Sequence, residues 1–254
     1  MANLKQWLKR VRGDNVIRHS EANIMKVLQR QNAQLAEIRT RLSQLEKPAA
    51  IDPETWGNVA QPGELAFHKR PNLRSTDEWE SKNKKFWERR GFDATGWDDK
   101  WIIDVGAGSR LRTLYFQGAK IAAIEPLADK YIAEVEWQDL DRAAEVYANP
   151  AEKEIPALHG RADLLVSVNA LDHGYDFEAA IANLRRYLKP DGLAYLTFDQ
   201  HERPDDLHQL MIDDNRARPI FTRCGFDIER FEEWGRYHGA AGPAALHYWL
   251  RPSS

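Results

Sequence analysis

The sequence has 254 residues, of which 43% are hydrophobic and 30% are charged. This composition is ordinary for a globular protein and excludes a chain that is disordered throughout, and the length suits one full α/β domain with an appendage. A formal net charge of −3 gives no overall attraction to nucleic acid, so we expect no nucleic-acid partner.

The chain carries one cysteine, Cys224. An intrachain disulfide is therefore excluded, and a reducing compartment is expected. The sequence contains no apolar run of the roughly 18 residues that a membrane span needs, and its first residues lack the apolar core and cleavage site of a signal peptide. These features predict a cytoplasmic protein.

Residues 1–47 are expected to form an amphipathic, coiled-coil helix, because no proline or glycine occurs between Asp14 and Lys47. Apolar residues recur there in heptads, with Leu28, Leu35 and Leu42 at one core position and Ile17, Ile24, Ile38 and Leu45 at the other. This combination favours trimers or tetramers over dimers, so we expect a homo-oligomer. The alternative is a helix that packs on its own domain.

A shorter apolar stripe lies in residues 1–12, at Leu4, Trp7, Leu8 and Val11, with lysines and arginines around it. Such a stripe could touch the anionic inner face of a membrane as a peripheral contact. The alternative is a helix end that is solvated or packed in the coiled coil.

Residues 48–74 are rich in proline and turn-forming residues, and are predicted to be a linker followed by an irregular segment. A capping box at Ser75-Thr76-Asp77-Glu78 predicts a helix to about Arg90. The third part, residues 75–254, is expected to be the catalytic domain.

From Trp101 onward, apolar runs alternate with amphipathic stretches, which predicts an α/β doubly wound, mostly parallel seven-stranded sheet of the Rossmann-like type. The expected strands are 101–106, 120–125, 144–148, 163–168, 193–199, 226–233 and 244–251. The clearest helix is expected over Asp176–Leu188, closed by a turn at Lys189-Pro190-Asp191-Gly192.

The segment WIIDVGAGSR places Gly106-Ala107-Gly108 directly after the first of these strands, and Glu125 ends the second. Glycines at a strand end let the backbone approach a ligand, and a carboxylate at the next strand's tip can accept hydrogen bonds from ribose hydroxyls. A dinucleotide site would need a third glycine, where this chain has Leu111, with Arg110 beside it. A nucleoside ligand without phosphate fits better.

The segments DVGAGSR, IAAIEP, NPAEKEIP, ADLLVSVNALDH and LKPDGLAYLTF follow one another in the order and spacing of the class I S-adenosylmethionine-dependent methyltransferases. The chain resembles that family over residues 97–252, which implies S-adenosylmethionine as cofactor and a closing antiparallel strand pair. The resemblance implies these cofactor-binding residues: Asp104, Gly106, Ala107 and Gly108 along the methionine moiety, Glu125 at the ribose, Ala151 and Glu152 beside the adenine, and Asn169, Ala170 and Leu171 over the cofactor.

Methyl transfer to a hydroxyl needs a base at the carboxyl ends of the strands. We identify His173, with Asp172 beside it, and His201 as the catalytic candidates, since a histidine near its ordinary pKa of about 6.5 can accept a hydroxyl proton. The alternatives are a polar cap on the cofactor pocket for His173 and an exposed loop residue for His201. These three residues and His208 could converge on a divalent metal, but they lack tight ligand spacing, so no metal ligand is assigned.

The segment FHKRPNLRSTDEWESKNKKFWERRGF is similar to the region that precedes the domain in bacterial methyltransferases of glycan and polysaccharide assembly, some of which carry a coiled coil. The resemblance implies O-methylation of a sugar hydroxyl of a glycan or glycan precursor. His68, Lys69, Arg70 and Arg74 would then form a positively charged lid, or else a solvated basic loop. The rival functions are methylation of a quinone or natural-product hydroxyl and a coiled-coil scaffold with a vestigial cofactor site.

Overall fold

The computed structural model describes residues 25–35, 52–70, 76–201, 206–208, 210–234 and 244–253. The chain divides into two units, Met1–Lys47 and Pro48–Ser254. In the first unit, residues 25–35 form a helix on which the side chains of Leu28 and Leu35 are 47% and 52% exposed. The other heptad residues and the stripe in residues 1–12 lie outside the described residues, so the coiled coil and the membrane contact remain predictions.

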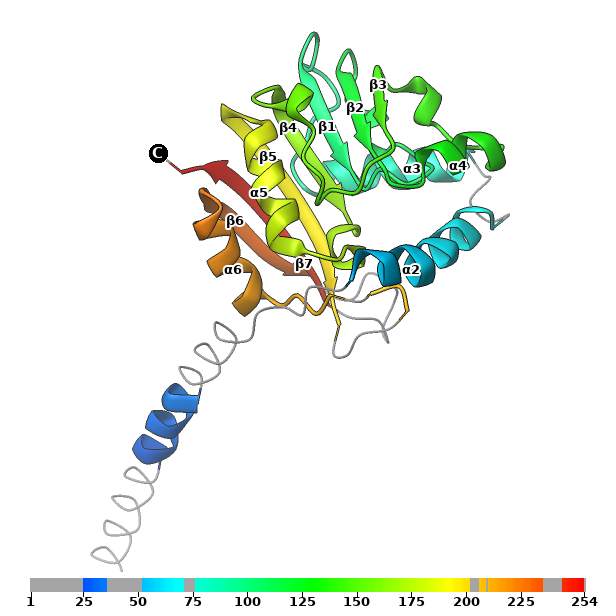
Figure 1. Cartoon of the computed structure of the whole chain (residues 1–254). Coiled ribbons are helices and arrows are strands. Elements are labelled where there is room, and N and C mark those ends of the chain that lie inside the picture. The colour runs from blue at the N-terminus through cyan, green and yellow to red at the C-terminus, as the bar shows by residue number, and fades with distance from the viewer. Residues whose placement is uncertain are drawn as a thin grey trace, which may run out of the picture. The chain divides into compact units, whose positions relative to one another are not determined.

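The second unit is built on one seven-stranded sheet with the strand order β3-β2-β1-β4-β5-β7-β6 (Figure 1). The strands are β1 (Trp101–Val105), β2 (Lys120–Ile124), β3 (Glu145–Tyr147), β4 (Ala162–Val168), β5 (Leu188–Gln200), β6 (Phe226–Trp234) and β7 (Ala244–Pro252). Pairing is parallel from β3 through β5, while β7 runs antiparallel to both β5 and β6. The sheet is therefore mixed, and the expected closing antiparallel pair is confirmed.

The helices of this unit flank the sheet and its carboxyl end. They are α2 (Pro53–His68), α3 (Thr76–Glu88), α4 (Ala128–Glu134), α5 (Phe177–Tyr187) and α6 (Asp214–Arg223), with the 3-10 helices η2 (Arg112–Tyr115), η3 (Leu140–Arg142), η4 (Pro156–Leu158) and η5 (Leu171–His173). Among the described residues, no helix is both long enough and apolar enough to cross a membrane.

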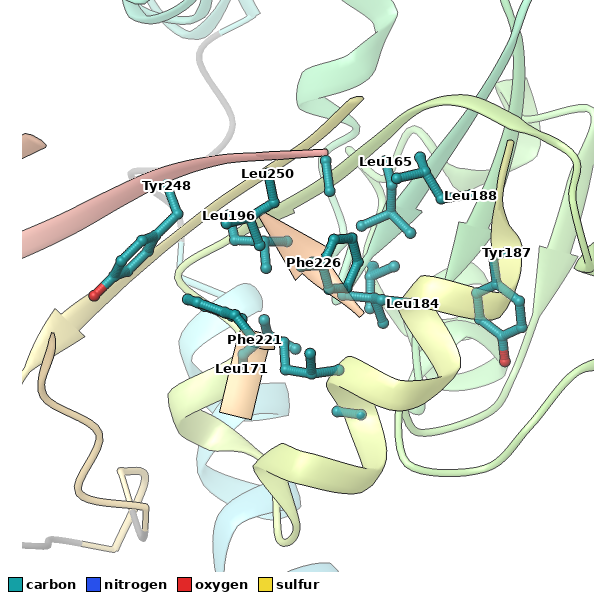
Figure 2. Packing of buried hydrophobic residues seen from close by; sticks show 14 of the residues in the cluster. Leu165, Leu171, Leu184, Tyr187, Leu188, Leu196, Phe221, Phe226, Tyr248 and Leu250 are labelled. Atoms are coloured by element: carbon teal, nitrogen blue, oxygen red, sulfur yellow. The ribbon is translucent and has the colours of Figure 1, made fainter. Parts of the chain in front are cut away.

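Alternation along β1 assigns the helices to the two faces of the sheet. Ile103 belongs to the core cluster under α5 and α6. Figure 2 shows part of this cluster, including Leu184 and Phe221. On the other face of the sheet, Ile102 packs with Trp87 of α3. Both isoleucines are fully buried. Because both faces of the parallel sheet are covered, β1 and β4 are mostly apolar on both sides.

The structure corrects the prediction of a linker with an irregular segment over residues 48–74, because residues Pro53–His68 form helix α2. Asp52 caps this helix by accepting a hydrogen bond from the Thr55 amide at 2.9 Å, and Pro53 occupies the first turn, where its missing N–H costs nothing. Pro62 lies inside the helix, and this internal proline concealed it in the sequence.

A second correction concerns the turn expected at Lys189–Gly192. Strand β5 begins at Leu188, before this segment, which lies inside the strand. The pairing of β4 with β5 shifts register between Ala162 and Leu164, and this irregularity accommodates the extra residues.

Candidate active site

A pocket opens at the carboxyl ends of β1, β2 and β4, where open α/β sheets bind their ligands. Its volume is about 640 Å³, including space that opens to solvent. The lining combines the loops after β1, β2, β3 and β4 with one face of α2.

The turn after β1 forms the floor of the pocket. Gly106 and Gly108 have φ angles of 65° and 63°, in the left-handed region that favours glycine. A β-carbon added at Gly106 would collide with the Ala170 side chain, and one added at Gly108 would lie 2.9 Å from the His68 ring. The two glycines therefore let the loop after β4 and helix α2 close against this turn.

Glu125, at the tip of β2, lies on the pocket wall with its carboxylate fixed by the backbone. One oxygen accepts a hydrogen bond from the Gly108 amide and the other from the Leu127 amide, each at 2.9 Å. Burial raises the pKa of Glu125 to about 7, although both amides favour the ionised form. Each oxygen keeps a further lone pair with which to accept a hydroxyl of a ligand.

Two of the predicted cofactor residues do not line the pocket. Asp104 accepts a hydrogen bond from the Thr113 hydroxyl at 2.7 Å, and burial raises its pKa to about 6. Ala107 packs in the cluster under α4. Alternation along β1 explains the position of Asp104, because its side chain points to the same face of the sheet as Ile102. The structure thus gives both residues a supporting position beneath the loop.

The loops after β3 and β4 supply the remaining predicted residues, and all of them line the pocket: Ala151, Glu152, Asn169, Ala170 and Leu171. Glu152 accepts a hydrogen bond from the Tyr175 amide at 2.7 Å, which ties the two loops together. Burial raises the pKa of this carboxyl.

Helix α2 lines the pocket with Trp56, Gln61, Glu64 and His68, of which the sequence analysis had named only His68. Trp56, Ala60, Glu64 and His68 recur at every fourth position, so they share one helix face. The Trp56 indole donates a hydrogen bond to the His173 carbonyl at 2.6 Å, and Glu64 contacts His173 Nδ1 at 2.7 Å. Figure 1 shows α2 lying across the end of the sheet. The four-residue spacing after Asp52-Pro53 was the signal that could have revealed this helix.

Of the residues of the predicted positively charged lid, His68 brings no charge to the pocket, and the lid stays a prediction. Burial lowers the pKa of His68 to about 4, outweighing the attraction of Glu64, so this ring is neutral at pH 7. Its Nδ1 lies 2.8 Å from the Ser109 hydroxyl. Lys69 forms an ion pair with Glu134, and the guanidinium of Arg70 lies over the Phe67 ring. Arg74 lies outside the described residues.

At the edge of the pocket, where His173 is part of the lining, three histidines gather around the buried carboxylate of Asp172. His201 Nε2 lies 3.3 Å from Asp172 Oδ2, and His173 Nε2 lies 4.0 Å from the same oxygen. The His208 ring stands between them, with its centroid 4.3 Å from that of His173 and 3.9 Å from that of His201. The structure therefore brings all three catalytic candidates together and adds His208. Burial alone would raise the pKa of Asp172, but the neighbouring His173, His201 and His208 outweigh this effect and lower it.

The family model described as "Methyltransferase domain" matches residues 28–239, which is most of the chain. The chain belongs to this methyltransferase family. A search of curated proteins found no match.

Solved structures agree with the fold of the methyltransferase. A 1,6-didemethyltoxoflavin N1-methyltransferase from Burkholderia thailandensis, solved with S-adenosylhomocysteine, aligns with a TM-score of 0.50 and 16% identity over 78% of this chain and 85% of that chain. A SAM-dependent methyltransferase from Leishmania major aligns with a TM-score of 0.55 and 15% identity over 79% and 85%. The [4+2]-cyclase SpnF aligns with a TM-score of 0.55 and 16% identity over 77% and 96%. At such identities the likeness concerns the fold alone.

The enzyme is an S-adenosylmethionine-dependent methyltransferase, and the composition of the pocket fits that cofactor. Glu64, Glu125 and Glu152 contribute three carboxylates to the lining, which among the described residues includes no lysine or arginine. A phosphate-bearing dinucleotide would meet no cationic partner there, whereas a nucleoside with a positive sulfonium is electrostatically matched.

Proposed function

We propose that this methyltransferase transfers the methyl group to a hydroxyl oxygen of a small molecule or glycan precursor, with His201 as the base. The observation that carries the proposal is the contact of His201 with buried Asp172, next to the cofactor pocket. A hydroxyl is a poor nucleophile that gains from a base in the transition state, and general-base assistance contributes typically 10²–10⁴-fold.

The nitrogens of the two histidine candidates favour His201 over His173. His173 Nδ1 is occupied by Glu64 and its Nε2 is buried on the side of Asp172. His201 uses Nε2 toward Asp172, and its Nδ1 makes no hydrogen bond to any residue that the structure describes. With the proton on Nε2 held by Asp172, the Nδ1 lone pair is left to accept the proton of the acceptor hydroxyl.

S-adenosylmethionine supplies the methyl group as an electrophilic carbon on a sulfonium sulfur. In the proposed step the acceptor oxygen bonds to this carbon, the carbon–sulfur bond breaks with its electron pair passing to sulfur, and the hydroxyl proton passes to His201. Most of the acceleration comes from holding donor and acceptor in line. Asp172 acts as a positioning residue that fixes the tautomer and orientation of His201.

The cofactor contacts proposed here follow from the pocket walls. Glu125 accepts hydrogen bonds from the ribose hydroxyls, and the Gly106–Gly108 turn leaves room for the methionine moiety. Ala151 and Glu152 flank the adenine, while residues 169–171 close the opposite side. Glu125 and Glu152 are already held by backbone amides, and the Gly106 and Gly108 amides also have fixed partners, so the pocket is largely preformed.

The acceptor proposed is a sugar hydroxyl, on the strength of the glycan-associated sequence resemblance. The stacked His208 and His201 rings support a polar acceptor, because imidazoles can hydrogen-bond the hydroxyls of a sugar. A quinone or other natural-product hydroxyl is the rival acceptor.

The test is methyl transfer from labelled S-adenosylmethionine to a panel of sugars, glycan precursors and phenolic compounds. We expect labelled methyl ether on a sugar, with kcat reduced about 10²–10⁴-fold in His201→Ala and S-adenosylhomocysteine binding retained. Unchanged kcat in His201→Ala would remove this residue from the base role. Tight cofactor binding with no turnover on any acceptor would instead favour the scaffold with a vestigial site.

A further inference from the structure

The cluster beside the cofactor pocket also has the geometry of a metal site. Asp172, His173 and His208 each present one ligand atom, and the three atoms all lie within 4.8 Å of one another. Asp172 and His173 come from η5, and His208 comes from the segment that follows β5. Residues far apart in the sequence are thus brought to one point, which explains why spacing along the chain gave no metal signature.

We propose that Asp172, His173 and His208 bind a divalent first-row transition-metal ion. One carboxylate with two imidazoles is a ligand set that suits zinc, iron(II), manganese or cobalt, and its mixed nitrogen and oxygen donors disfavour calcium and magnesium. Three protein ligands also leave at least one coordination position open for an exchangeable oxygen.

The two nitrogens of His173 are arranged as in metal-binding histidines. Glu64 Oε1 lies 2.7 Å from Nδ1, while Nε2 is on the side of Asp172. A carboxylate that accepts the Nδ1–H fixes the tautomer with its lone pair on Nε2 and raises the basicity of that nitrogen toward a metal. Glu64 is itself on α2, so the helix that covers the cofactor pocket also orients this ligand.

One carboxylate oxygen of Asp172 is available to coordinate an ion. Its side chain is fully buried, and Oδ2 contacts His201. Oδ1 is buried without a hydrogen bond to any of the residues described in the structure. Leaving an ionised oxygen buried in that state is costly, and coordination of a cation removes the cost.

The observed spacing is slightly wider than that of a loaded site. Ligand atoms about 2.1 Å from a tetrahedral zinc are about 3.4 Å from one another, compared with separations of up to 4.8 Å here. Movements of less than about 1 Å for each ligand atom close this difference, and small rotations of the imidazole and carboxylate groups supply them.

The consequence for catalysis rests on the proposed methyl transfer, whereas the metal binding does not. An acceptor hydroxyl on the open position would have its pKa lowered by the ion. His201 contacts Asp172 and stacks on His208, so it would be placed to take the proton.

The test is a titration of the full chain, freed of metal by a chelator, with Co²⁺ or Zn²⁺, followed by calorimetry and by the visible absorption of Co²⁺. We expect one equivalent to bind, with affinity reduced at least 100-fold in His208→Ala and about 10–100-fold in Glu64→Gln. His159→Ala is the matched control, because His159 pairs with Glu154 outside the pocket lining, and it should bind as the wild type does.

Two results would overturn the proposal: less than 0.1 equivalent bound by folded wild-type protein, or equal affinity in His208→Ala and wild type. Retained S-adenosylhomocysteine binding shows that His208→Ala is folded. The titration needs no acceptor, so its outcome stands apart from that of the methyl-transfer assay. Cobalt binding without any methyl transfer would support the metal site and count against the proposed reaction alone.

Discussion

The buried carboxyl group of Glu125 forms part of the cofactor pocket, and burying its ionised form destabilises the folded protein. Its side chain is 6% exposed, and two backbone amides hold it in place. Burial nevertheless dominates and raises its pKa from the ordinary 4.5 to about 7. The folded protein thus keeps a proton on Glu125 that the unfolded chain releases between these two pH values.

We therefore expect the stability contributed by Glu125 to be fully present below about pH 4.5 and to be lost as the pH rises through about 7. The variant Glu125→Gln cannot titrate, so its melting temperature relative to wild type should rise from pH 5 to pH 8. Each kcal/mol shifts the melting temperature of a domain of this size by about 2–4 °C. A difference that stays constant over this range, measured by calorimetry, would contradict the raised pKa.

Gly106 is the second residue whose identity the pocket requires. Its φ of 65° and the adjacent Ala170 side chain leave no place for a β-carbon. Gly106→Ala should lower stability by about 1–3 kcal/mol and should weaken S-adenosylhomocysteine binding. Gly91→Ala is the matched control, since Gly91 also has a positive φ but has open space around it. Equal cofactor affinity in the two variants would show that the contact with Ala170 is irrelevant to the pocket.

Among the elements, α2 has the largest effect on the interpretation of the site. It contributes a wall of the pocket, orients His173 through Glu64 and fills the space above Gly108 with His68. Asp52-Pro53 is a recognisable signal for the start of this helix, but Pro62 and two glycines lower its helix propensity. Packing against the domain overrides that propensity, and sequence patterns cannot show such packing.

The position of α2 predicts different effects for substitutions on its two faces. Trp56→Ala removes the hydrogen bond to the His173 carbonyl and part of the pocket wall, so S-adenosylhomocysteine affinity should fall about 10–100-fold. Val59 is 41% exposed on the same helix, and Val59→Ala should leave that affinity unchanged. Equal affinity in both variants by calorimetry would show that α2 does not cover the bound cofactor.

At the scale of the whole molecule, hydrophobic alternation predicted all seven strands of the sheet to within a few residues, apart from the earlier start of β5. Apolar runs such as WIIDV are buried on both faces, so their pattern is strong. The glycine turn and Glu125 were predictable because both follow directly from strand ends. The sequence identified the histidines of the cluster but could not show that they lie together, because this depends on how His208 is placed against η5.

The N-terminal unit carries a separate prediction. Leu28 and Leu35 are exposed in the single chain, and we expect them to be buried between copies in a trimer or tetramer. Light scattering should report an oligomer for wild type and a monomer for the double variant Leu28→Lys, Leu35→Lys. Ala33→Lys introduces a lysine at an outward heptad position and should leave the oligomer intact. A monomeric wild type would contradict the coiled coil.

The central claim is that the cofactor occupies the pocket beneath α2 with its ribose held by Glu125. Titration calorimetry of S-adenosylhomocysteine against wild type and Glu125→Gln tests it most directly. The account predicts one site in wild type and at least tenfold weaker binding in Glu125→Gln, because an amide cannot accept two ribose hydroxyls as a carboxylate does. Equal affinity in the two proteins, or no heat of binding with folded wild type, would contradict it.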